Sequence, residues 1–527
     1  MATTQTQFPP SSGPARSLDP GRGQGRVHPG DAWLLATAAF TVAFAGSWAR
    51  SMWYDEAATV TGATRPLAEL WRLAGHVDLV HAAYYAGMHF WTGWFGVSEA
   101  ALRVPSALAA AVACGLTVVL GQRLGTRATG VLAGAVLAVM PRMMWAGTEI
   151  RQYALTAALS ALLALALLRA WRTGRFRDWA AYVAVAVAGV VVFMFFAFGV
   201  AAMAGAALLL RRRPVATLAA SAAAAAICLP FILRCIQQQG QVSWIPPLRN
   251  GLFELGVNQF YSGTTRATGW IGPWMAALAV LSLVLALVGL VSAVRARPVR
   301  DGSGQYRPRP ANRQLAGLAL CGLAVPFLCI LALQVFGDPA YRNRYLTYTA
   351  PFLALLVGSG LAVLLSRRPR RPADRVAGLA RATGVGALCA LVALGLLFQP
   401  WVRLHNGGST VPTRDVAQTV AAFSGPGAAI VPNRAHDRYR FIAYPALYAA
   451  VEDLTQSRDR VAAGTLWGSY RKITAERLAG RGQVWWIADT RRKTPELEAF
   501  EEAGCTLVRS WEQFRGTRLR EYDCTDQ

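Results

Sequence analysis

Long apolar runs, separated by short segments rich in arginine, constrain this chain more than any other feature of its sequence. The first run covers residues 32–47, and runs of about 20 residues recur until Phe398. An α-helix of that length crosses the hydrocarbon core of a bilayer. Only 15% of the 527 residues are charged and 54% are hydrophobic, which excludes an ordinary soluble globule. We therefore expect a polytopic α-helical membrane protein.

The arginine clusters indicate how the chain is oriented. A net charge of +25 is also typical of nucleic-acid-binding proteins, but here the arginines are grouped between the apolar runs. Cytoplasmic loops of membrane proteins carry such an excess of positive charge. Placing the arginine-rich loops inside gives about eleven spans, with the N-terminus in the cytoplasm and the C-terminus outside. The stretch 179–210 is too long for one span and is expected to form two short helices that turn near 195–198.

The same pattern divides the chain into three parts. Residues 1–31 are rich in Pro, Gly, Ser and Gln and are expected to form a disordered cytoplasmic tail. Residues 32–399 form the transmembrane part. It carries a first external loop at 50–99, with amphipathic stretches typical of interfacial helices, and a second large external loop at 237–270. Residues 400–527 have the pattern of a soluble domain.

This C-terminal part is predicted to be a small α/β domain outside the membrane. Short buried strands are expected at 428–431 and 484–487, and helices at 413–423 and 495–502. Six of the eight cysteines lie in or beside apolar runs and lack metal-ligand spacing. The other two, Cys505 and Cys524, bracket a predicted final hairpin. Outside the cytoplasm these two cysteines are a candidate disulfide.

Four groups of polar residues fall on the external face, where loops on a rigid scaffold commonly carry binding and catalytic residues. They are Asp55 with Glu56; Asp78 with His81, Tyr84 and Tyr85; Glu149, Arg151 and Tyr153 in a short turn predicted at 145–153; and Arg342 with Arg344. Some of these residues also have a purely structural interpretation. Two acids such as Asp55 and Glu56 are favourable at any helix N-terminus. His81 can belong to the polar face of an interfacial helix.

The last two groups have alternatives of the same kind. Glu149 can be a capping acid with Arg151 as its partner. Arg342 and Arg344 can be interface anchors. External arginines nevertheless oppose the orientation bias, which favours anion binding by this pair.

The order of the groups forms a pattern. Its pieces are 53–57 (Trp-Tyr-Asp-Glu-Ala), Asp78 and 81–85, 95–99 with 102–107, 149–155 (Glu-Ile-Arg-Gln-Tyr-Ala-Leu), and Arg344-Tyr345-Leu346 before Pro351. In this order and on one side of the membrane, they resemble the GT-C superfamily of membrane glycosyltransferases, specifically its protein-mannosyltransferase-like branch. The resemblance covers the transmembrane part, most clearly its first third. The C-terminal domain does not resemble the repeat domain of eukaryotic protein mannosyltransferases.

The resemblance implies an inverting transfer of a sugar from a polyprenyl phosphate to a hydroxyl acceptor. It makes Asp55 the general base, accompanied by Glu56 as the second catalytic acid. The resemblance also implies that the donor phosphate is bound by Arg344, Arg342 and Arg151. The residues that support the donor and acceptor sites are Asp78, His81, Tyr84, Glu149 and Tyr153.

The sequence makes no cofactor certain. Glu149 and His81 are the candidate ligands for a divalent cation, magnesium or manganese, in such a site. Many family members have two prolines after a histidine near this position, whereas this chain has Ala82 and Ala83 after His81. This departure leaves the role of His81 open.

The expected location is the cell membrane, with the active site and the C-terminal domain on the extracytoplasmic side. The implied partners are a polyprenyl-phosphate sugar, carrying mannose or another hexose or pentose, and a cell-envelope glycan, lipid or protein as acceptor. No nucleic acid is expected. The alternatives are a transporter or flippase of a lipid-linked sugar and a non-catalytic cell-envelope assembly protein. Transporters commonly show internal repeats and charges near the midplane, and this sequence shows neither.

Overall fold

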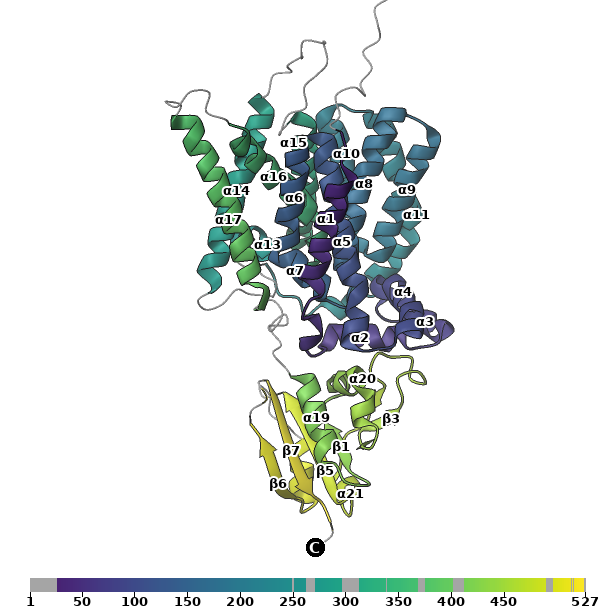
Figure 1. Cartoon of the computed structure of the whole chain (residues 1–527). Helices are drawn as coiled ribbons and strands as arrows, with labels where there is room; N and C mark the ends of the chain where they lie inside the picture. Colours follow the sequence, from purple (N-terminus) through teal and green to yellow (C-terminus); the bar gives the residue numbers. More distant parts are fainter. Residues whose placement is uncertain are drawn as a thin grey trace, which may run out of the picture.

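The computed structural model describes residues 26–525 except 249–250, 262–270, 296–311, 338, 368–374, 401–411, 490–495, 513 and 515. Most of the predicted N-terminal tail and part of the second external loop therefore lie outside the described residues. The rest forms a bundle of long helices, a layer of short helices at one end of it, and a separate α/β domain beyond that layer (Figure 1).

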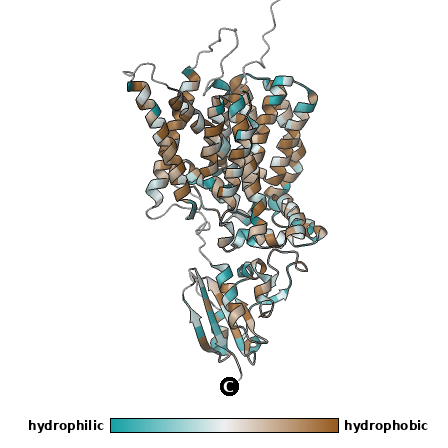
Figure 2. Ribbon diagram, in the orientation of Figure 1, coloured by the Kyte–Doolittle hydropathy of each residue, from teal (hydrophilic) through white to brown (hydrophobic). Residues whose placement is uncertain are grey.

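Eight helices in the described part of the chain are long and apolar enough to cross a membrane. They are α1 (Pro29–Phe44), α5 (Glu99–Leu124), α8 (Tyr153–Thr173), α11 (Pro214–Gln237), α14 (Ile271–Arg295), α15 (Arg313–Phe336), α16 (Ala350–Ser366) and α17 (Arg375–Leu397). Figure 2 shows that the helices of this bundle are largely hydrophobic, whereas the α/β domain mixes hydrophilic and hydrophobic residues.

A bent pair of helices supplies a ninth candidate span. α6 (Arg127–Val139) and α7 (Pro141–Thr148) meet at an angle of 60°. The bend falls at Met140 and Pro141, because proline lacks the amide hydrogen that would continue the helix. Residues 145–148 of the external turn predicted at 145–153 therefore belong to α7, every residue of which is buried. Residues 149–152 form the turn that leads into α8.

Two shorter helices follow α8. α9 (Phe176–Val192) and α10 (Ala197–Leu210) are separated by the extended Phe193 and a 3₁₀ turn at Met194–Phe196. They occupy the run in which two short helices were expected. The predicted total of eleven spans requires both to cross the bilayer, although they have only 17 and 14 residues. The total of eleven spans therefore stays a prediction, as does the orientation of the bundle in the membrane.

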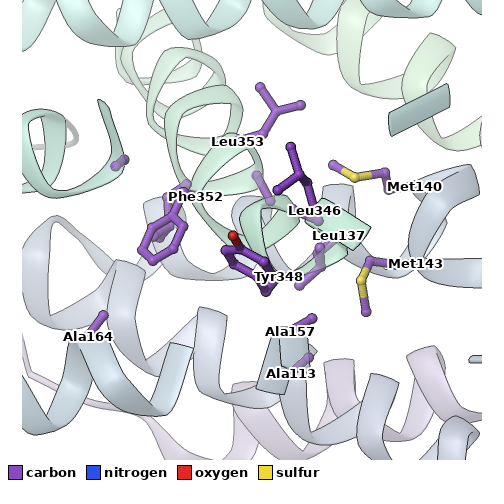
Figure 3. Packing of buried hydrophobic residues seen from close by; sticks show 14 of the residues in the cluster. Ala113, Leu137, Met140, Met143, Ala157, Ala164, Leu346, Tyr348, Phe352 and Leu353 are labelled. Carbon is purple, nitrogen blue, oxygen red and sulfur yellow. The ribbon is translucent and has the colours of Figure 1, made fainter. Parts of the chain in front are cut away.

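The interior of the bundle is closely packed. η5 (Asn343–Thr349), a 3₁₀ helix, leads into α16, and together they contribute Leu346, Tyr348, Phe352 and Leu353 to the cluster shown in Figure 3. Leu137, Met140 and Met143 of α6 and α7 and alanines of α5 and α8 complete this cluster. Because η5 begins the same segment, its polar residues are held by the core of the bundle.

Three short helices lie between the bundle and the α/β domain (Figure 1). They are α2 (Tyr54–Ala63), α3 (Leu67–Ala74) and α4 (Leu79–Phe95), and all three belong to the predicted first external loop. α4 leaves Phe90, Trp94 and Phe95 exposed, as expected of aromatic side chains at a membrane interface. Within the second external loop, the described residues form the short helices α12 (Gly251–Phe253) and α13 (Gln259–Tyr261) around a π-helical turn.

The C-terminal domain is built on a five-stranded sheet of order β2-β1-β5-β7-β6. The strands are β1 (Ala429–Pro432), β2 (Glu452–Asp453), β5 (Gln483–Asp489), β6 (Thr506–Trp511) and β7 (Thr517–Asp523). β2, β1 and β5 are parallel, whereas β7 pairs antiparallel with both β5 and β6. A pair of short strands, β3 (Gln456–Arg458) and β4 (Ser469–Tyr470), stands apart.

Four helices accompany this sheet: α19 (Thr413–Phe423), α20 (Tyr439–Ala443), α21 (Ala475–Leu478) and α22 (Glu496–Glu502). Trp485 and Trp486 of β5 are fully buried, one on each side of the sheet. Cys505 and Cys524 form a disulfide between the start of β6 and the end of β7. The hydrophobic cluster that contains Trp485 continues without a break into α2 and α4, so the domain is packed directly on the layer of short helices.

Candidate active site

Asp55 lies at the centre of a charged cluster where the layer of short helices meets the bundle. Its position in the first turn of α2 leaves its side chain 17% exposed. One carboxylate oxygen, Oδ2, is 2.9 Å from Nη2 of Arg344, and the other, Oδ1, is 3.9 Å from Nη2 of Arg151. One accessible acid is thus held between two arginines.

The two arginines reach Asp55 from two other elements. Arg344 lies on η5, and Arg151 lies in the turn between α7 and α8. η5 is anchored through Tyr348, whose hydroxyl donates to the carbonyl of Phe195 at 2.8 Å. The carbonyl of Tyr348 accepts a hydrogen bond from Ser160 of α8. Three of the polar groups identified in the sequence therefore meet at one point.

Glu56 lies beneath Asp55, inside the protein. Its side chain has no exposed surface and pairs with Arg103 at 2.7 Å and with Arg50 at 2.8 Å. The backbone amide of Ile150 donates to the same carboxylate. Burial opposes ionisation, but Arg103 and Arg50 outweigh it and hold the pKa of Glu56 below its ordinary value. The structure thus places Glu56 under the site, where it joins α2 to α5, and out of reach of a substrate.

Glu149 is the third acid of this cluster. It accepts hydrogen bonds from Arg50, at 3.0 Å, and from the indole nitrogen of Trp53. Burial raises the pKa of Glu149 to about 7, against the attraction of Arg50. The Trp53 ring lies 5.5 Å from the guanidinium carbon of Arg344, so Glu149 orients a residue that contacts the phosphate-binding candidate.

Arg151 connects the site to α4. It donates to the hydroxyl of Tyr85 at 2.8 Å, and this hydroxyl donates to Asp78 at 2.9 Å. Burial raises the pKa of Asp78, with Arg151 acting in the opposite direction. Tyr84, the supporting tyrosine expected from the sequence, points elsewhere and lies 3.3 Å from Ser106. Neighbouring residues of a helix face different directions, and Tyr85 is the one that faces the site.

His81 and Tyr153 form the apolar side of the site. His81 Nδ1 is 2.6 Å from the amide nitrogen of Gln152, and its ring is stacked on Phe193. Burial, together with Arg151 and Arg344, lowers the pKa of His81 well below its ordinary value. Tyr153 is stacked between Trp145 and Tyr345. These aromatic rings surround the cluster of charges with a wall of low polarity.

Arg342 stands beside the cluster. Its guanidinium carbon lies 4.3 Å from the centre of the Trp244 ring, in the second external loop. This side chain is half-buried, unlike Arg344 and Arg151, which are 8% and 4% exposed. Arg342 is therefore the most accessible cation of the three that were expected to bind phosphate.

The residues of the site fit a divalent cation poorly. The candidate ligands Glu149 and His81 already have protein partners, namely Arg50 with Trp53 for the acid and Gln152 for the imidazole. In the part of the chain that the structure describes, no three His, Cys, Asp or Glu residues are grouped as metal ligands. The buried arginines beside the acids would also repel a metal cation. The same arginines suit the site to an anion.

Several residues of the cluster were not identified as functional in the sequence. Trp53, Gln152 and Arg103 lie in the recognised pieces 53–57, 149–155 and 102–107, and Arg50 lies just before the first of them. A signal was available for the two arginines, because both lie in segments that the sequence predicts to be external, where the orientation bias disfavours positive charge. Each is paired with acids or backbone carbonyls of the same cluster.

Comparison with known proteins shows which sequence family and which solved structures the chain resembles. Residues 84–235 match the family model described as dolichyl-phosphate-mannose-protein mannosyltransferase. The structure of ArnT from Cupriavidus metallidurans bound to undecaprenyl phosphate shares 13% identity with the chain, with a TM-score of 0.51 over 94% of this chain and 98% of that one. ArnT in the apo state gives a TM-score of 0.53, also at 13% identity, over 93% and 97% of the two chains. No curated protein sequence matches the chain. The fold is thus shared over nearly the full length of both proteins.

Proposed function

We propose that the chain transfers a sugar from a polyprenyl phosphate to a hydroxyl group. The family match and the shared fold support a mannosyltransferase-like member of the GT-C superfamily of membrane glycosyltransferases. The family description contains dolichyl phosphate, and one ArnT structure contains undecaprenyl phosphate. Both molecules are long isoprenoid chains with one phosphate group. Mannose is the first candidate sugar because the family description contains it.

The observation that carries this proposal is the position of Asp55 between Arg344 and Arg151. A hydroxyl group is a weak nucleophile until a base removes its proton. Asp55 is a partly exposed carboxylate and can accept that proton. Arg344 and Arg151 can bind the phosphate whose negative charge grows as the glycosidic bond breaks. Such a transfer needs a base next to an anion-binding group, and the ion pair of Asp55 with Arg344 supplies both.

The reaction is a single displacement. The acceptor oxygen forms a bond to the anomeric carbon while the bond from that carbon to the phosphate oxygen breaks. The proton of the hydroxyl passes to Asp55, and the electron pair of the broken bond stays on the polyprenyl phosphate. Attack from the side opposite the phosphate inverts the anomeric configuration.

Donor binding also changes the pairing of Asp55 in this arrangement. Without a donor, Arg344 is paired with Asp55 and stabilises its carboxylate. A bound phosphate competes with Asp55 for Arg344, which frees a carboxylate oxygen of Asp55 to accept the proton of the hydroxyl group. Arg342, held over the ring of Trp244, is placed to add a further contact to the phosphate.

The test is transfer by the full chain reconstituted in liposomes. Undecaprenyl-phosphate mannose with labelled mannose serves as the donor, and a cell-envelope extract serves as the source of acceptors. We expect Asp55→Asn to lower the transfer rate at least about 100-fold, the size of a lost general base. Asp415→Asn is the matched control, because Asp415 also lies in a helical first turn but is exposed and belongs to α19 of the C-terminal domain.

Two results would contradict the proposal. A folded Asp55→Asn protein that transfers mannose at the wild-type rate would exclude Asp55 as the base. Movement of the intact lipid-linked sugar across the liposome membrane, without a new glycosidic bond, would identify a transporter.

A further inference from the structure

The position of Asp55 depends on α2, a helix that is not stable by itself. α2 has ten residues, and an isolated helix shorter than about 12–15 residues is marginal in water. No side chain caps its N-terminus. The direction in which Asp55 points is therefore set by whatever holds α2 in place.

One segment of the C-terminal domain, residues 459–468, holds α2 near both ends. In the first turn, the indole nitrogen of Trp467 donates to the hydroxyl of Tyr54 at 3.0 Å, and the two ring centres are 4.8 Å apart. In the last turn, Arg460 donates to the carbonyl of Thr61 at 2.7 Å and to the hydroxyl of Thr64 at 2.9 Å. Tyr54 is the residue immediately before Asp55.

Further contacts make this attachment continuous. The hydroxyl of Thr61, a fully buried residue, donates to the carbonyl of Leu466 at 3.0 Å. The amide of Met52, just before α2, donates to the hydroxyl of Tyr444 at 2.7 Å. Tyr439 of α20 packs its ring against Tyr54, with centres 5.5 Å apart. The first and last turns of α2 are thus tied to a domain more than 350 residues away in the chain.

We propose that Arg460 and Trp467 are positioning residues of the transferase, which fix α2 and so hold the carboxylate of Asp55 against Arg344. This inference rests on the function proposed above. Neither residue contacts Asp55, and both act through Tyr54, Thr61 and Thr64 on the helix that carries it. The C-terminal domain is then a part of the catalytic apparatus and more than an attached module.

The proposal separates catalysis from donor binding. Arg344 and Arg151 belong to η5 and to the turn between α7 and α8, which the 459–468 segment does not hold. Loosening α2 therefore leaves the phosphate site intact but moves the base. A displacement of about 1 Å can cost on the order of 100-fold in rate, so kcat is expected to fall while the KM for the donor changes little.

The experiment uses Arg460→Ala in the full chain, with Arg471→Ala as the matched control. Arg471 belongs to the same domain, and its side chain donates to the carbonyl of Gln456 inside that domain. Amide hydrogen exchange of residues 54–63, measured by mass spectrometry, reports on α2 without any substrate. We expect Arg460→Ala to speed this exchange at least about tenfold and to lower kcat by a similar factor, with the KM for undecaprenyl-phosphate mannose within about twofold. Arg460→Lys is expected to recover part of both effects.

A second pair of variants tests the first turn. Trp467→Ala removes the ring and the hydrogen bond, and we expect the same pattern of faster exchange and lower kcat. Trp467→Phe keeps a ring against Tyr54 and is expected to retain most of the activity. A variant that does not fold would instead show faster exchange throughout the bundle.

Each outcome has a definite meaning. Unchanged exchange in α2 of Arg460→Ala would overturn the inference, and so would faster exchange with wild-type kcat. A fall of kcat in Arg471→Ala as large as in Arg460→Ala would also overturn it. A wild-type protein that transfers no sugar would overturn the proposed function, and the exchange result alone would then decide whether the segment fixes α2.

Discussion

Asp55 and Glu56 are adjacent in the chain but have different surroundings. Consecutive residues of a helix point about 100° apart, so one carboxylate of α2 faces the site while the other enters the protein. Asp55 keeps some contact with solvent, whereas Glu56 has none and is enclosed by Arg50 and Arg103. These surroundings suit different tasks, chemistry for Asp55 under the proposed function and stability for Glu56.

The different tasks predict different consequences of neutralising each acid. Glu56→Gln leaves Arg103 buried without a carboxylate, and breaking a buried ion pair in this way costs about 3–5 kcal/mol. We expect Glu56→Gln to lower the melting temperature in detergent clearly, and Asp55→Asn to lower it little. Tryptophan fluorescence during a thermal ramp measures both. Equal melting temperatures for Glu56→Gln and the wild type would show that this ion pair does not stabilise the fold.

At this scale the sequence identified the site better than the role of each residue. Asp55, Arg151 and Arg344 could be predicted, because a charged residue at a membrane surface is costly unless it is solvated, paired or used in function. The partner of Arg151 was missed, since Tyr84 and Tyr85 are equivalent in composition and only the rotation of α4 distinguishes them. Arg50 was missed because it falls between the first apolar run and the acidic motif and belongs to neither.

At the scale of elements, the apolar runs located helices well but their interruptions poorly. The run 179–210 was expected to turn near 195–198, and the break lies at Phe193 and in the 3₁₀ turn after it. No charged residue or proline marks this break in the sequence. Residues 145–148 of α7 were expected to begin an external turn, because the eight residues of this helix are too few to be recognised as part of a span.

Two glycines in α16 allow close approach of neighbouring helices. A Cβ atom added at Gly360 would collide with the carbonyl oxygen of Leu285 in α14, and one at Gly358 would lie 2.5 Å from the amide nitrogen of Ala133 in α6. Small residues at such crossings are typical of membrane helices. α16 follows directly from η5, so its packing also fixes Arg344.

This packing predicts that Gly360→Ala destabilises the protein. The added methyl group has no space between α14 and α16, and overpacking of this kind costs about 1–3 kcal/mol. Gly386→Ala in α17 is the control, because a Cβ atom there meets nothing within 4 Å. We expect a lower melting temperature for the first variant and no loss for the second. The packing argument fails if both variants melt at the same temperature.

For the whole molecule, the arrangement brings together segments that no local pattern connects. The C-terminal domain lies at the same end of the bundle as α2, the helix that carries Asp55 (Figure 1). Arg414 joins it to η1 (Ser47–Ala49), the 3₁₀ helix that follows α1, through the carbonyls of Trp48 and Ala49, and to Glu99 at the start of α5. The sequence predicted a domain on the external side but not its contact with α2, because each contact pairs residues hundreds of positions apart.

The side of the membrane on which this domain lies can be tested through its disulfide. Cys505 and Cys524 are bonded, as expected of a domain in an oxidising compartment and not of one in the cytoplasm. If the domain is extracytoplasmic, a membrane-impermeant phosphine reductant added to intact cells reaches this bond. We then expect an impermeant maleimide to label two further thiols per chain, which peptide mass spectrometry assigns to Cys505 and Cys524.

The control is the variant with Cys505→Ser and Cys524→Ser, which should gain no label on reduction. The six other cysteines are free and lie in α5, α11, α15 and α17, where helices or lipid surround them. The labelling of these residues should not depend on the reductant. If Cys505 and Cys524 become reactive only after the membrane is permeabilised, the domain and Asp55 face the cytoplasm, because both lie at the same end of the bundle. The proposed donor would then have to present its sugar on that side.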